Sequence, residues 1–172
     1  GVFELGDFDL SDAQIDRFFT ENLVIAGVND AGIVLGSISP DNATNLTLRT
    51  NGRISEQTVD TSLNISNVNR LSLVAGGDIG TMPTSRGANN NATLIDVDVN
   101  RLNVNVTKPG TVNINDTAGD LVVERIFTTS GDIRLDAVGD VRLRKVTANS
   151  EITVFSSNGS LGLGNHSASE GI

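Results

Sequence analysis

Short segments in which apolar and polar positions alternate recur along most of the chain. Each has an aliphatic residue at its first and third positions, a period of two that is typical of a β-strand with one buried face. Turns rich in Gly, Asn and Asp separate the segments. The pattern predicts nine strands, centred on 46–48, 71–73, 102–104, 112–114, 121–123, 133–135, 141–143, 152–154 and 161–163.

The spacing of these segments indicates how they are arranged. Alternate segments form two series, each with a period near 20 residues, so one period holds two strands. That repeat is typical of a solenoid, whereas a β-sandwich gives no reason for alternate strands to resemble each other. The fold class predicted is therefore all-β, a parallel β-helix with about 20–25 residues per rung. The series start at Leu102, Leu121, Val141 and Leu161, and at Val112, Ile133 and Ile152.

Two parts of the chain depart from the strict period. The steps between segments lengthen upstream of Arg101, and a polar, aperiodic stretch near 82–92 predicts a loop inserted into one rung, either a binding loop or a tolerated insertion.

Residues 1–22 form an N-terminal segment, and residues 23–172 carry the repeats. Within the first segment Ser11 and Gln14 have capping-box spacing. We expect a short helix over 11–20 whose Phe18 and Phe19 either cover the open end of the core or lie over one coil.

In a parallel β-helix, residues one period apart stack at the strand spacing of about 4.8 Å. One predicted polar column contains Arg101, Asp120, Asp140 and Ser160, and another contains Asn113, Arg134 and Thr153. Two carboxylates at that distance repel by roughly 1 kcal/mol in water. Asp120 and Asp140 therefore need a partner, for which Arg101, Arg142 and a bound Ca²⁺ are the candidates.

Recurring Gly-Asp pairs admit two interpretations, turn chemistry and metal ligation. Gly supplies a positive φ and Asp bonds to backbone in turns, whereas Ca²⁺-binding repeats need tandem Gly-Gly-x-Gly-x-Asp. Only 76–80 approaches that motif, and it does not repeat. We favour turn chemistry, and the sequence predicts no metal and no cofactor.

Composition further limits the classes of function that this chain can have. With 12 Lys plus Arg against 21 Asp plus Glu, the net charge is −9, which argues against nucleic acid as a partner. Cysteine is absent, so thiolate chemistry is excluded, and no apolar run is long enough for membrane insertion. Candidate acid–base pairs are Asp96 with Asp98 and Asp132 with Glu151. A solvated face explains them better, because the chain has no Trp or Tyr to stack a sugar, and we predict no catalytic residue.

The stretch from Leu10 to Arg17, then Asn22 to Gly27, and the Gly-Asp-Ile-Arg-Leu type of strand resemble the repeat regions of filamentous-haemagglutinin-like large exoproteins. The resemblance implies a right-handed β-helix in a long bacterial fibre, extracellular or on the cell surface, used for adhesion, aggregation or matrix building. We therefore expect a non-catalytic structural or adhesive module. Its expected partners are copies or adjoining repeats stacked end to end, and cell-surface or matrix polysaccharide. The alternative is a polysaccharide-cleaving enzyme of pectate-lyase type.

Overall fold

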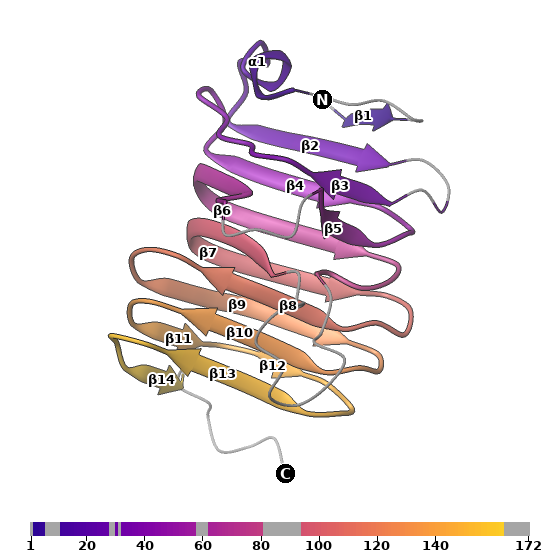
Figure 1. Cartoon of the computed structure of the whole chain (residues 1–172). Helices are drawn as coiled ribbons and strands as arrows, with labels where there is room; N and C mark the ends of the chain where they lie inside the picture. Colours follow the sequence, from indigo (N-terminus) through magenta and orange to yellow (C-terminus); the bar gives the residue numbers. More distant parts are fainter. Residues whose placement is uncertain are drawn as a thin grey trace.

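The computed structural model describes residues 2–5, 11–27, 30, 32–57, 62–80 and 94–163. Its strands stack into one column, with the N-terminal elements at one end and the C-terminal elements at the other (Figure 1). The elements are β1 (Val2–Leu5), α1 (Asp12–Ile15), β2 (Asn22–Gly27), β3 (Ile33–Leu35), β4 (Asn45–Arg49), β5 (Ile54–Glu56), β6 (Ile65–Ala75), β7 (Ile95–Val106), β8 (Val112–Asp116), β9 (Leu121–Thr128), β10 (Ile133–Ala137), β11 (Val141–Leu143), β12 (Val146–Thr147), β13 (Ile152–Ser156) and β14 (Leu161–Leu163).

Parallel pairing between successive turns confirms the predicted β-solenoid. One face of the column, here called face A, stacks β1, β2, β4, β6, β7, β9, β11 and β14 in that order. Its inner register runs from Leu23 through Leu46 and Leu71 to Leu102, one residue per turn. Such a register places like side chains over like, so each rung continues the core of the one before it.

The second predicted series forms another face of the same column. Here β8, β10 and β13 pair in parallel, and Val112, Ile133 and Ile152 lie in one register. Isolated bridges join Ile54 to Ile79 and Ile79 to Val112, which extends this face toward the N-terminal rungs. All nine predicted segments lie within strands of the structure.

The core is a continuous aliphatic column inside the coil. Alternate strand residues point inward, as the period of two requires, and in the central rungs they are fully buried. Burial of each such side chain contributes about 1.5–3 kcal/mol. The fully buried positions include Leu71, Leu73, Ile79, Ile95, Val97, Leu102, Val104, Val112, Ile114, Val123, Ile126 and Leu135.

The N-terminal helix is shorter than the sequence predicted. It ends at Ile15 rather than near residue 20, although Gln14 Oε1 accepts the Ser11 backbone N–H at 2.9 Å, as a capping box requires. Ile15 is buried and Phe18 packs against the core, but Phe19 is 85% exposed. The expectation that both phenylalanines cover the core is therefore wrong for Phe19. The helix is held to the solenoid through Asp12, whose Oδ1 accepts the Ser39 backbone N–H at 2.7 Å.

One predicted polar column is displaced. Arg101 lies opposite Val122, two residues beyond Asp120, in the register between β7 and β9. The second column, Asn113 with Arg134 and Thr153, has the predicted register, but Asn113 is fully buried and not outward as expected.

The stacked aspartates are stabilised by backbone rather than by the proposed arginines. Asp120 Oδ1 accepts the backbone N–H of Asp140 at 2.9 Å, and Asp140 Oδ1 accepts that of Ser160 at 2.7 Å. Each carboxylate thus caps the turn of the next rung. This is the side-chain-to-backbone chemistry expected of the Gly-Asp pairs, but it acts between rungs instead of within one turn.

The loop predicted near 82–92 lies outside the described residues. Within the ranges that the structure does describe, no helix has the length and apolar character needed to cross a membrane.

Candidate functional site

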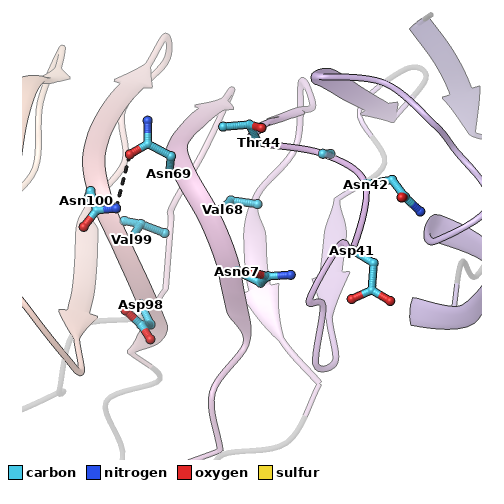
Figure 2. A pocket seen from close by; sticks show the side chains of 10 residues that line it. Asp41, Asn42, Thr44, Asn67, Val68, Asn69, Asp98, Val99 and Asn100 are labelled. Atoms are coloured by element: carbon cyan, nitrogen blue, oxygen red, sulfur yellow. Dashed lines mark hydrogen bonds between the residues drawn. The ribbon is translucent and has the colours of Figure 1, made fainter.

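A polar groove of about 500 Å³ lies at the corner of the solenoid where the chain enters face A. Three successive turns contribute to it: the segment before β4, the middle of β6 and the middle of β7. Figure 2 shows their side chains aligned along the groove, with Val68 and Val99 between the polar groups. The polar lining is made mainly by Asp41, Asn42, Asn67, Asn69, Asp98 and Asn100.

A backbone irregularity in β6 forms this corner. Ile65 pairs with Val97 but Val68 pairs with Val99, so β6 has one residue more than β7 between these two pairs. Asn67 absorbs the extra length with a φ of 59°, in the left-handed region. Asn is among the few residues that adopt this conformation readily, and the bulge turns the strand at the groove.

Hydrogen bonds orient the amide groups of the groove. Asn67 Nδ2 donates to the Pro40 carbonyl at 3.1 Å and Asn42 Nδ2 donates to the Asp16 carbonyl at 2.8 Å. Their Oδ1 atoms therefore remain as acceptors. Asn100 Nδ2 donates to Asn69 Oδ1 at 3.2 Å, the bond drawn in Figure 2.

Two exposed carboxylates complete the lining. Asp41 and Asp98 lie on either side of Asn67 in Figure 2, and within the described part of the chain neither carboxylate forms an ion pair. The groove therefore presents mainly hydrogen-bond acceptors and negative charge. Its chemistry suits a ligand that donates hydrogen bonds or carries positive charge.

A buried carboxyl lies next to the groove. Asp116, at the end of β8, is fully buried, and its Oδ1 accepts the backbone N–H of Val99, a groove residue, at 3.4 Å. Its Oδ2 has no hydrogen-bond partner among the described residues. Burial raises the pKa of Asp116 to about 7. The hydrogen bond from the Val99 N–H acts in the opposite direction and lowers the pKa, whereas the negative charge of Asp98 raises it further.

The structure does not bring the two predicted carboxylate pairs together as acid and base. Asp96 is buried and accepts from Asn115 Nδ2 at 2.6 Å, whereas Asp98 is exposed in the groove. Asp132 Oδ1 accepts the backbone N–H of Glu151 at 3.1 Å, so Asp132 caps a rung as Asp120 does. Among the residues described, no group of three or more His, Asp or Glu is arranged to hold a metal ion.

Sequence reasoning identified neither the groove nor Asp116. A signal for the groove was present in the repeat of Asn69-Arg70-Leu71 as Asn100-Arg101-Leu102, which places an Asn directly before face A in consecutive turns. Nothing in the sequence distinguishes Asp116 from the aspartates at the turns, because its burial depends on the stacked rungs on either side.

Comparisons with known proteins add no functional information. The sequence matches no protein-family model, and no match was found among curated proteins or solved structures. The functional interpretation therefore rests on the solenoid, its groove and its charges.

Proposed function

We propose that this chain is a structural and adhesive repeat module of an extracellular or bacterial surface fibre, without catalytic activity. The observation that carries the proposal is the in-register stack of face A, in which Leu23, Leu46, Leu71 and Leu102 succeed one another across four turns. A coil of this kind adds length with each rung and contacts only its neighbours. It suits a part that spans distance and presents side chains along its length.

Stacking of further rungs on the last described strand is supported by its composition. Leu161 is 53% exposed and Leu163 is 82% exposed, whereas Leu121, in register two turns earlier, is buried. Among the described residues β14 pairs only with β11, and an exposed apolar edge strand favours addition of another strand. We therefore propose an adjoining rung or a neighbouring copy as the partner at this edge.

The alternative of a polysaccharide-cleaving enzyme has less support. Such an enzyme needs a proton donor and acceptor near one bond, and one carboxylate of each pair first considered for that role instead accepts a hydrogen bond from Asn115 or from a backbone N–H. The acidic groove would also repel the uronate chains that pectate-lyase-type enzymes cleave. The resemblance to filamentous-haemagglutinin-like exoproteins agrees with the fibre proposal.

Electron microscopy of the native material, combined with an activity assay, tests the proposal. We expect thin filaments, and no release of unsaturated sugars from polygalacturonate with or without Ca²⁺. Discrete particles that cleave the polymer would overturn the fibre in favour of the enzyme. Discrete particles with no cleaving activity would overturn the fibre alone.

A further inference from the structure

Positive charge is concentrated on the outer side of face A. Although the chain has a net charge of −9, seven of its 12 Lys and Arg residues lie on these strands or between β11 and β12, and all seven are exposed. Glu124 is the only acidic residue in the described β2, β4, β9, β11 and β14 and in the face A parts of β6 and β7 (70–75 and 101–106). We call this surface the basic face: Arg49, Arg70, Arg101, Arg125, Arg142, Arg144 and Lys145.

Negative charge follows the adjacent corner. Asp41, Asp120 and Asp140 precede strands of face A, Asp98 lies within β7 just before its face A part, and all four are exposed. The segments that carry them, 41–44, 98–100, 117–120 and 138–140, contain no Lys or Arg. We call these four residues the acidic corner, and the groove is its N-terminal part. Both surfaces run along the solenoid axis with the same strand spacing of about 4.8 Å.

The basic face already binds one carboxylate within the chain. Glu124 lies between two arginines: its Oε1 accepts from Arg101 at 3.1 Å and its Oε2 pairs with Arg70. A guanidinium has five donors in a planar fork, so both arginines keep donors for a second acceptor. The groove offers such acceptors, namely the carboxylates of Asp41 and Asp98 and the Oδ1 atoms of Asn42 and Asn67.

We propose that the basic face is a docking surface for the acidic corner of a second copy of this chain. Arginines of one solenoid enter the groove of the next, and the copies lie side by side with their axes aligned. The two surfaces differ, so the contact is heterologous and does not close on itself. When the contact is repeated from copy to copy, it joins rods side by side. This inference rests on the proposed fibre and adds a lateral contact to its end-to-end growth.

Charge complementarity favours a second copy over other occupants. Complementary charge selects partners and suppresses wrong ones, and one chain carries both surfaces with one periodicity. A long polyanion on the basic face would run beside the acidic corner and be repelled by it. Exposed ion pairs are individually weak and screened by salt. We therefore expect weak pairing of short rods, strongest at low ionic strength.

Sedimentation velocity on the full chain and three double variants tests this contact. Arg70→Gln with Arg101→Gln removes two of the seven positive charges of the basic face, and Asp41→Asn with Asp98→Asn removes both carboxylates of the groove. Arg53→Gln with Lys108→Gln removes the same charge from exposed positions elsewhere. Circular dichroism and thermal melting of each variant establish that it folds.

The wild-type chain should self-associate with rising concentration at low salt and become monomeric in about 1 M salt. Each of the first two variants should raise the dissociation constant about tenfold or more, and the Arg53/Lys108 control should change it less than about twofold. A mixture of the face and groove variants should associate again, because one supplies an intact corner and the other an intact face.

Three results would overturn the proposal: a wild-type chain that stays monomeric at low salt, variants that associate as the wild type does, or a mixture that does not recover. If the wild type stays monomeric but binds alginate through Arg70 and Arg101, the basic face belongs to an anionic polymer. Single, unbundled filaments in micrographs would refute lateral docking and leave the fibre intact. Particles without filaments would refute the fibre itself.

Discussion

At the scale of single residues, the turns are stabilised by a small set of repeated contacts. The carboxylates of Asp78, Asp120, Asp132 and Asp140 each accept a backbone N–H from the following rung. A hydrogen bond of this kind contributes about 0.5–1.5 kcal/mol when it is made. Its loss also leaves a turn N–H without its partner. The aspartates are thus structural, which explains their recurrence without any catalytic role.

Glycine is required at these turns for two different reasons, and substitutions can distinguish them. Gly119 has a φ of +74° with open space around it, whereas a Cβ on Gly139 would lie 1.9 Å from the Gly119 carbonyl oxygen. We expect Gly119→Ala to destabilise the fold by about 1–2 kcal/mol, the cost of a left-handed Ala. Gly139→Ala should cost clearly more, because two rungs must move apart. Equal losses of the free energy of unfolding in urea would show that no close contact exists.

Asp116 makes stability depend on pH. The pKa of Asp116 is about 7 in the folded chain and near 3.8 when unfolded. Its contribution to the stability of the folded chain is therefore fully present below about pH 4 and is lost as the pH rises through about 7. We expect Asp116→Asn to remove this loss while keeping an oxygen for the Val99 N–H. The stability of the variant relative to wild type should rise by about 2–4 kcal/mol from pH 4 to pH 8.

Urea unfolding at several pH values measures the effect of Asp116. Because only the change with pH is compared, any constant cost of burying the asparagine amide cancels. Asp41→Asn is the matched control, since it removes a carboxylate that is exposed in the groove. A relative stability of Asp116→Asn that stays level across this range would contradict the buried, ionisable state.

At the scale of elements, the sequence was sufficient for nine of the fourteen described strands and for their order. A period of two within segments and of about 20 between them depends only on which residues are apolar, and the same property decides which side chains lie inside. The register of Val112 with Ile133 and Ile152 was predicted for this reason. The predicted helix was too long. The spacing of Ile15, Phe18 and Phe19 is helical, but whether so short a segment forms a helix depends on tertiary contacts.

The groove and the displaced column could not be predicted, because the groove depends on a bulge and the column on the exact register between two strands. One extra residue of β6 near Asn67 turns the strand at the groove, and the pairing of β7 with β9 sets Arg101 opposite Val122, two residues beyond Asp120. A bulge changes pairing by one residue without changing the apolar pattern. Asp98 and Asp116 come close because Val97 of β7 pairs with Asp116 of β8. Residues 95–97 were not among the predicted strands, so this part of the candidate site was not predicted.

The contribution of a rung depends on its place in the stack, and one register column tests this. Leu121 is buried and Leu161 is 53% exposed in the same column. We expect Leu121→Ala to lower the free energy of unfolding by about 2–4 kcal/mol, and Leu161→Ala by less than about 1 kcal/mol. Thermal melting of both variants provides the comparison. A large loss for Leu161 would indicate that its edge is covered in solution.

At the scale of the whole molecule, a solenoid gains stability from neighbouring rungs rather than from one central core. Stability is then approximately a sum of rung and interface contributions. A rung inside the stack has two interfaces and an end rung has one. The core aliphatics of β6 and β7 are buried, whereas Ile152 of β13 and Leu161 and Leu163 of β14 are exposed. Local opening should therefore begin at the β13–β14 end.

Native-state hydrogen exchange measures this gradient directly. We expect backbone amides of β6 and β7 to exchange most slowly, those of β9 and β10 faster, and those of β13 and β14 fastest, since a rung opens only with the less stable rungs beyond it. Leu121→Ala should speed exchange in β9 and β11 more than in β4. If all strands exchanged at one rate, the chain would open as a single cooperative unit. The description of the chain as a coil whose rungs contribute additively to stability, which supports the proposed fibre, would then be wrong.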